Sequence, residues 1–150
     1  MRDDARGRTL SIVRGRSKGD SAGGTDPTAR GEIPVNTTES VLDHHLEAFG
    51  DQDIEETMTD YADEAILITH GGTLHGHEEI AGLFEDLFAE FSQEPVDFSL
   101  EERRIDGEYA YIVWNADTPD NDYEFATDTF VIRDGEIVAQ TLGTVVVPKD

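Results

Sequence analysis

The sequence predicts a single α+β domain in which helices come first and an antiparallel sheet follows. Apolar residues recur at helical spacing before Gly50 and again between Gly76 and Pro95. The last third instead holds extended runs separated by turn residues, over 96–105, 109–118, 122–133 and 136–147. A chain of 150 residues is long enough to bury one sizeable core.

The first helix is expected to begin at Asn36, Thr37 or Thr38, because short polar side chains cap helix N-termini. Gly50 is expected to end it, since glycine readily adopts the left-handed C-cap conformation. Its apolar face consists of Val41, Leu42, His45, Leu46 and Phe49.

A short second helix should follow Asp51 or Asp53 and end near Tyr61. A strand over 65–69 and a brief return strand over 73–75 enclose a Gly-Gly turn. The third helix then opens at Gly76, where we expect a side chain to clash with the strand, and Pro95 stops it. Its apolar face holds Ile80, Leu83, Phe84, Leu87, Phe88 and Phe91.

Three turns connect the four final runs into a meander. Asp106-Gly107 and Asp134-Gly135 are typical of two-residue type I′ hairpins, in which both central residues have positive φ. The segment Pro119-Asp120-Asn121 supplies the third turn. We therefore expect the four runs to form an antiparallel sheet.

Charge is the strongest compositional feature. The chain has 34 acidic and 11 basic residues, a net charge of -23, and its first 30 residues hold seven of the basic ones. Heavy acidity with few lysines favours adaptation to molar salt, where charge repulsion is screened. An acidic decoy for a basic partner, or a disordered acidic chain, is the alternative. The lack of basic clusters argues against nucleic-acid binding.

Several other classes are excluded by composition. The absence of cysteine excludes disulfides and thiolate chemistry. No apolar run approaches the roughly 20 residues that span a bilayer, so no membrane association is expected. No secretory signal follows the first arginines, and a cytoplasmic location is the expectation.

Residues 1–35 differ from the rest, being rich in Gly, Ser and Arg. We expect a disordered tail or a start site assigned too far upstream, with a weakly basic binding arm as the alternative. The folded domain is predicted over 36–150.

Four short segments carry a resemblance to a known family: 50–54, 61–65, 74–80 and 133–137. Their order and spacing resemble the nuclear transport factor 2-like (NTF2-like) superfamily in its SnoaL-like branch. The resemblance implies a cone-shaped fold with three N-terminal helices packed on a strongly curved antiparallel sheet. It also implies a ligand pocket at the open end of the cone and a homodimer formed through the outer face of the sheet.

Ketosteroid isomerases are well-known enzymes on this fold, and they use a carboxylate base with an oxyanion hole of a tyrosine and a protonated acid. A gapless alignment with them places His45 at the tyrosine, Thr69 at the base and Thr129 at the acid. A threonine cannot abstract a carbon-bound proton at neutral pH, so the resemblance does not extend to that mechanism.

His45 and Tyr61 are the candidate catalytic residues. His45 lies on the core-facing stripe of the first helix, and an imidazole titrates near neutrality, which suits proton transfer. Tyr61 is expected to aim its hydroxyl at the cavity and to orient His45. The alternative is a core histidine whose hydrogen bonding is satisfied by that hydroxyl.

The alignment and strand alternation predict the rest of the pocket. Asp128 is placed on the opposite face of its strand, toward solvent or a dimer partner. Trp114 suits either a core filler or a ligand platform. The predicted lining residues are Thr69, Phe84, Ile112, Trp114, Thr127, Thr129 and Gln140.

No metal or cofactor is expected. His70, His75 and His77 surround one hairpin, but a metal needs ligands that converge from rigid elements, and local hydrogen bonds suffice for a histidine at a helix start. We therefore expect a small-molecule-binding protein, which could act as an isomerase, dehydratase or cyclase on an unknown substrate. The alternative is a non-catalytic association domain.

Overall fold

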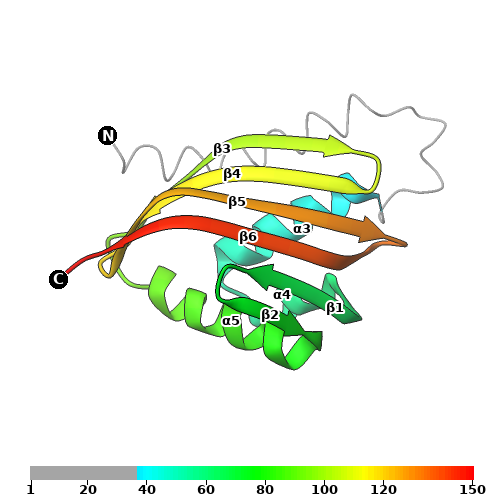
Figure 1. Ribbon diagram of the computed structural model, residues 1–150, viewed down its shortest axis with the longest axis horizontal. Helices are drawn as coiled ribbons and strands as arrows, with labels where there is room; N and C mark the ends of the chain where they lie inside the picture. The colour runs from blue at the N-terminus through cyan, green and yellow to red at the C-terminus, as the bar shows by residue number, and fades with distance from the viewer. Residues whose placement is uncertain (1–36) are drawn as a thin grey trace.

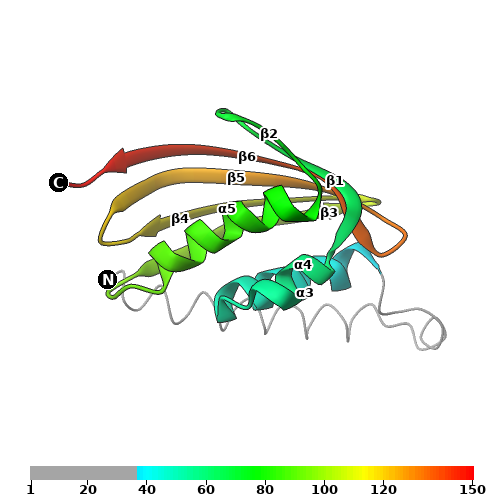
Figure 2. The same cartoon turned by 90° about the horizontal axis from the view of Figure 1, so that it is seen from below.

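The computed structural model describes residues 37–150 and confirms the predicted α+β class. The predicted tail of residues 1–35 lies outside the described part. In the described part, three helices pack on one face of a six-stranded sheet (Figures 1 and 2). In chain order the elements are α3 (Thr38–Asp51), α4 (Ile54–Thr59), β1 (Tyr61–Thr69), β2 (Gly72–His75), α5 (Gly76–Phe91), β3 (Asp97–Asp106), β4 (Tyr109–Asp117), β5 (Asn121–Arg133) and β6 (Glu136–Pro148).

The sequence predicted an antiparallel sheet, but the sheet in the structure is mixed. Its strand order is β2-β1-β6-β5-β4-β3, and β1 runs parallel to β6 while all other neighbours are antiparallel. A parallel pair needs a long crossover connection, which α5 and the meander supply here. The predicted four-strand meander is confirmed and supplies four of the six strands, β3 to β6.

Two further details of the predicted cone differ. Among residues 37–150, only α3 and α4 precede the first strand, because α5 lies between β2 and β3. The predicted strong curvature is not confirmed, although the long strands arch over the helices (Figure 2). Within residues 37–150, no helix has the length and hydrophobicity needed to cross a membrane.

Local backbone geometry explains most helix ends. Thr37 caps α3 by accepting a hydrogen bond from the Ser40 backbone N–H at 3.0 Å, as predicted. The helix ends at Gln52, with φ of 56°, rather than at Gly50. Asp53 immediately caps α4 through the N–H of Glu56 at 3.1 Å. A link of two residues therefore sets α3 and α4 side by side.

Glycines act through backbone conformation at two positions. Gly76 has φ of +80°, and a Cβ added there would lie 3.6 Å from the Asp63 carbonyl, an ordinary contact. The predicted clash at Gly76 is therefore wrong, and its positive φ explains the glycine. At the last hairpin Asp134 and Gly135 both have positive φ, at 53° and 80°, as the predicted type I′ turn requires.

Polar contacts anchor α5 and α3 to the sheet. At the end of α5 the Glu90 carboxylate accepts hydrogen bonds from Thr118, Asn121 and Tyr123 at 2.6–2.8 Å. At the start of α3, Asp43 pairs with the buried Arg103 of β3 at 2.7 Å. Both helices are therefore held at fixed places across the sheet.

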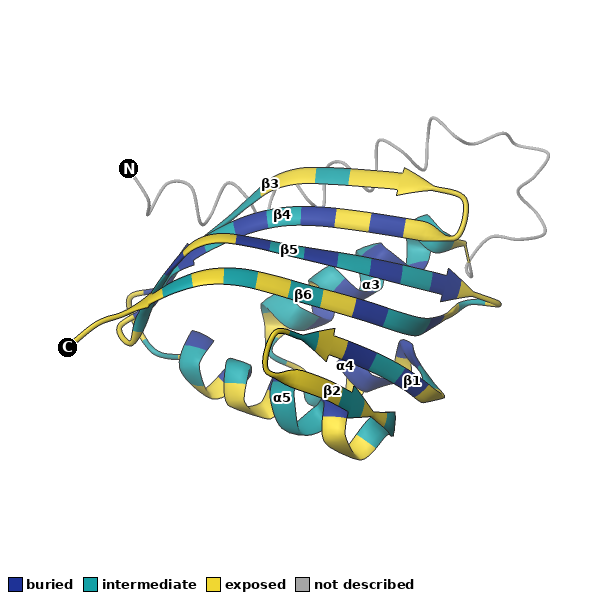
Figure 3. Cartoon of the chain, in the orientation of Figure 1, coloured by how far each residue is buried: buried dark blue, intermediate teal, exposed yellow. Residues whose placement is uncertain are grey.

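The core lies between the helices and the sheet. Buried and exposed residues alternate along β4 and β5, so one row of each strand faces the helices (Figure 3). Trp114 lies in the inward row of β4, which also contains Ala110, Ile112 and Ala116. This row forms the floor of the site described next.

Candidate functional site

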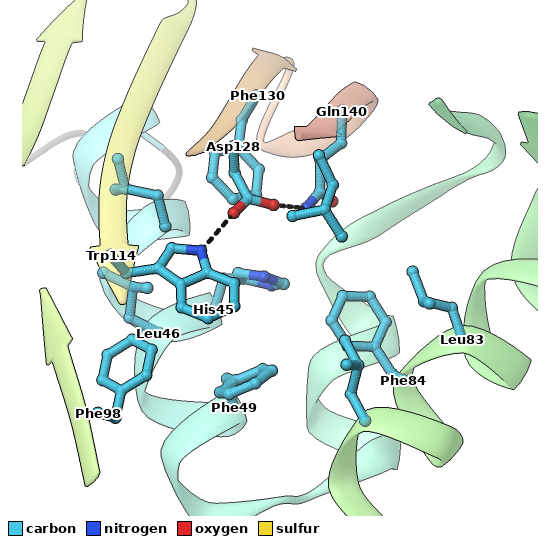
Figure 4. A pocket seen from close by; sticks show the side chains of 13 residues that line it. His45, Leu46, Phe49, Leu83, Phe84, Phe98, Trp114, Asp128, Phe130 and Gln140 are labelled. Atoms are coloured by element: carbon cyan, nitrogen blue, oxygen red, sulfur yellow. Dashed lines mark hydrogen bonds between the residues drawn. The ribbon is translucent and has the colours of Figure 1, made fainter. Parts of the chain in front are cut away.

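A small cavity lies between α3, α5 and the inward face of the sheet (Figure 4). Its volume is about 40 Å³, which holds a few water molecules at about 10–15 Å³ each. Half-buried apolar side chains surround its mouth. The lining residues are His45, Leu46, Phe49, Leu83, Phe84, Leu87, Phe98, Ile112, Trp114, Asp128, Phe130, Gln140 and Leu142.

The polar lining groups are few, and they gather at one end of the cavity. His45, Asp128 and Gln140 are all buried, with 3–6% of each residue exposed. Asp128 and Gln140 come from the sheet, whereas His45 comes from α3 (Figure 4). The opposite wall is apolar, so the cavity would place a polar end of a ligand against this group.

A chain of hydrogen bonds fixes Asp128. Trp114 donates its Nε1–H to Asp128 Oδ1 at 2.8 Å, and Gln140 donates its Nε2–H to Asp128 Oδ2 at 2.8 Å. The Tyr61 hydroxyl in turn donates to Gln140 Oε1. Each carboxylate oxygen of Asp128 thus receives one N–H, and the side chain is held in one orientation.

Burial controls the protonation of two groups in this chain. Burial raises the pKa of Asp128, and the hydrogen bonds from Trp114 and Gln140 and the proximity of His45 oppose this only in part. Burial also raises the pKa of Tyr61 well above its usual value, with the charges of Asp128 and Asp60 adding to the effect. Tyr61 is therefore a neutral donor, and Asp128 is a carboxyl group that takes up a proton more readily than an exposed one.

His45 is enclosed by aromatic rings. Its imidazole packs edge-on against Tyr61, Phe84 and Phe130, with ring centroids 5.2–5.7 Å apart. The Tyr61 hydroxyl bonds Gln140 and not His45, so the expected hydrogen bond between the two candidate catalytic residues is absent. The nearest carboxylate oxygen to His45 Nδ1 is Asp60 Oδ2 at 3.7 Å.

The structure brings together five of the predicted residues at the cavity: His45, Phe84, Ile112, Trp114 and Gln140. The predicted catalytic Tyr61 reaches the cavity only through Gln140.

Three predicted threonines lie elsewhere. Thr69 is at the β1–β2 turn, where its hydroxyl accepts the N–H of Gly71 at 3.0 Å. Thr127 and Thr129 are on the outer face, because they alternate with the buried Ala126, Asp128 and Phe130. None of the three lines the cavity.

The prediction that Asp128 faces away from the core is wrong. A register irregularity between Tyr123 and Phe125 shifts the alternation of β5, so that Tyr123 and Asp128 both point inward. Asp128 pairs with Ile112 of the inward row of β4. The signal in the sequence was Trp114, since a buried indole N–H needs an acceptor and Asp128 is within reach on the next strand.

The three histidines around the first hairpin form no common site. His77 Nε2 lies 2.8 Å from the Tyr61 carbonyl oxygen, a local hydrogen bond that holds the start of α5 against β1. Among residues 37–150, no three histidine, cysteine or acidic side chains are arranged to hold a metal ion.

The fold has many relatives among solved structures. An NTF2-like protein of unknown function from Cytophaga hutchinsonii matches with a TM-score of 0.63 at 10% identity, over 76% of this chain and 94% of the other. A proposed ketosteroid isomerase from Kribbella flavida gives 0.62 at 12% identity, over 77% and 84%. A proposed polyketide cyclase from Sinorhizobium meliloti gives 0.58 at 16% identity, over 74% and 95%.

These identities establish a shared fold and no shared activity. No curated protein matches the sequence. The sequence pattern of the SnoaL-like domain, however, matches residues 42–140, from the middle of α3 to the Gln140 that holds Asp128. By this match and by its NTF2-like fold, the chain belongs to the SnoaL-like family.

Proposed function

We propose that this chain binds a small, mainly apolar molecule and transfers a proton on it, as an isomerase, dehydratase or cyclase would. The observation that carries the proposal is the buried Asp128, which faces an otherwise apolar cavity beside His45. Burial raises the pKa of Asp128 toward the range in which a carboxylate accepts a proton from carbon efficiently. Structural relatives described as a proposed isomerase and a proposed cyclase support chemistry of this kind on the same fold.

The two groups have complementary roles in this proposal. Asp128 acts as the base, and its carboxylate is held still by Trp114 and Gln140. His45 acts on a second atom of the ligand as an acid or base, because it comes from α3 whereas Asp128 comes from the sheet. Tyr61 positions Asp128 through Gln140 and does not touch the ligand.

The cavity must widen for such a ligand. Its volume of about 40 Å³ is far below the roughly 300–1,000 Å³ of typical ligand pockets. The half-buried Leu46, Phe49, Leu83 and Leu87 at the mouth are the side chains that would move. The proposal therefore requires a ligand that displaces apolar side chains between α3 and α5.

Trp114 provides the test, because it is the only tryptophan of the chain and lines the cavity. Cyclic ketones and enones are titrated into the protein one at a time. A compound that binds should change the Trp114 fluorescence up to a saturating value. For each ketone that binds, deuterium uptake from D₂O at the α-carbon, followed by NMR, reports proton transfer directly.

The variants Asp128→Asn and His45→Gln should bind and lose exchange by about 10²–10⁴-fold, the usual contribution of a general base. Thr127→Val, on the outer face next to Asp128, is the matched control and should exchange normally. Undiminished exchange in both site variants, or no exchange with any bound ketone, would refute the proposal.

A second proposal concerns the outer face of the sheet, which carries large exposed apolar residues. Tyr109, Phe125, Val145 and Val147 are each about half exposed, at 46–56%. We propose that this face forms a homodimer, as an association domain would, without excluding the cavity chemistry. Light scattering in molar KCl should give twice the chain mass, and Phe125→Glu should restore the monomer.

We also propose that the net charge of -23 adapts the protein to a cytoplasm of molar salt.

A further inference from the structure

Two consecutive histidines of α3 approach one carboxylate. Successive side chains of a helix point about 100° apart, so His44 faces α4 and solvent while His45 faces the cavity. Asp60, the residue between α4 and β1, lies between them. Its side chain is 8% exposed, against 41% for His44 and 5% for His45.

The four groups alternate between acid and imidazole from solvent to the cavity. Glu56 Oε1 lies 2.8 Å from His44 Nε2, and His44 Nδ1 lies 2.7 Å from Asp60 Oδ1. The second oxygen of Asp60, Oδ2, lies 3.7 Å from Nδ1 of His45. Asp60 is thus the carboxylate among these four groups that faces both histidines.

The surroundings of His44 favour its charged form. Both ring nitrogens face a carboxylate oxygen, an arrangement in which each nitrogen donates a hydrogen bond. Burial opposes the charge, but the hydrogen bonds to Glu56 and Asp60 outweigh it and raise the pKa of His44. His44 therefore donates a hydrogen bond to Asp60 Oδ1, and Oδ2 is the oxygen that can accept one from His45.

Asp60 and His45 are too far apart to form a hydrogen bond in this structure. Neither His45 Nδ1 nor Asp60 Oδ2 has a hydrogen-bond partner among residues 37–150, and both atoms are buried. A buried polar atom without a partner costs about 1–3 kcal/mol. Shortening the 3.7 Å separation to about 2.9 Å would satisfy both atoms at once.

Asp128 already has a donor for each of its oxygens. Trp114 donates to one and Gln140 to the other, whereas Asp60 Oδ2 accepts from no residue within 37–150. The hydrogen of neutral His45 is therefore better placed on Nδ1, toward Asp60, than on Nε2. The lone pair of Nε2 is then free for a ligand.

We propose that Asp60 is the positioning residue of the site: it fixes His45 in the tautomer with hydrogen on Nδ1, and His44 and Glu56 hold Asp60 in place from the solvent side. This inference rests on the proposed function only in taking His45 as the group that acts on the ligand. Asp60 itself touches no ligand.

The tautomer can be read without any ligand, by ¹⁵N NMR of the full chain labelled at histidine. Neutral His45 should show hydrogen on Nδ1. In the isosteric Asp60→Asn variant the amide oxygen should stay with His44, so the amide N–H₂ faces His45 and moves its hydrogen to Nε2. Glu55→Gln, on the exposed side of α4, should leave the tautomer unchanged.

The catalytic consequence is measured separately on a ketone that binds the native protein. Asp60→Asn should reduce deuterium exchange by at least tenfold while the Kd from Trp114 fluorescence stays unchanged. Hydrogen on Nε2 in the native protein would overturn the positioning role, even if Asp60→Asn did not fold. Hydrogen on Nδ1 without ketone exchange would instead sink the proposed function and leave the positioning role standing.

Discussion

Replacing Tyr61 by phenylalanine tests the hydrogen-bond chain that fixes Asp128. The ring keeps its packing against His45 and Phe84, at centroid distances of 5.7 and 6.0 Å, so the change removes only the hydroxyl. Gln140 Oε1 is then left buried without a donor, because Gln140 is 3% exposed. Such an orphaned acceptor costs about 1–3 kcal/mol in the free energy of unfolding, or roughly 4–12 °C in Tm for a domain of this size.

A double-mutant cycle with Gln140→Leu separates this hydrogen bond from general packing. Gln140→Leu should cost more than Tyr61→Phe, since it leaves both the Tyr61 hydroxyl and Asp128 Oδ2 unpaired. Adding Tyr61→Phe to Gln140→Leu should then cost little, because no partner remains to be lost. Urea unfolding followed by circular dichroism in molar KCl measures all four proteins.

Additive costs within about 0.5 kcal/mol would refute the reasoning. Tyr109→Phe is the control, because Tyr109 is 56% exposed and its hydroxyl should matter by less than about 0.5 kcal/mol.

Three other predictions follow from charge and backbone geometry. Folding raises the pKa of Asp128, so the protonated carboxyl stabilises the folded state below the unfolded pKa of 3.8, and this stabilisation is lost as pH rises through the folded pKa. Unfolding curves at several pH values should show this loss in the native protein and not in Asp128→Asn. Raising KCl from 0.1 to 1 M shortens the Debye length from about 10 to 3 Å, so the urea midpoint should rise for a chain of net charge -23; an unchanged midpoint would argue against salt adaptation. Gly76→Ala should destabilise by about 1–2 kcal/mol because of its φ of +80°, whereas Gly82→Ala in open space on the same helix should stabilise by up to about 1 kcal/mol; equal thermal midpoints for the two variants would contradict this.

Local signals predicted most of the fold. The apolar stripes of α3 and α5 and the Asp-Gly turns depend on neighbours in the sequence, and they predicted these elements to within a few residues. The parallel pairing of β1 with β6 joins segments about 70 residues apart, and no local pattern encodes it. The start of β1 at Tyr61, four residues earlier than predicted, has the same cause, since Tyr61 pairs with Ile137.

The site was predicted less completely, for a different physical reason. Side chains on α3 and β4 follow one unbroken period, and there His45, Ile112 and Trp114 reach the cavity as expected. In β5 the irregularity after Tyr123 changes the period, and a shift of one residue exchanges the two faces of a strand. The gapless alignment takes no account of such a shift, and it placed Thr127 and Thr129 inward and Asp128 outward, the reverse of the structure.

The anchors at the ends of the two helices have a kinetic consequence. Glu90 fixes the end of α5, and Arg103 fixes the first half of α3, whereas neither contact involves the last turn of α3. Phe49 lies on that turn and packs against Phe88 and Phe91 of α5, with ring centroids 5.2 and 5.6 Å apart. A ligand that enters between Phe49 and α5 has to separate this aromatic contact first. The observed rate of ligand binding should therefore reach a plateau as the ligand concentration rises, and the plateau should equal the rate at which the Phe49 contact opens.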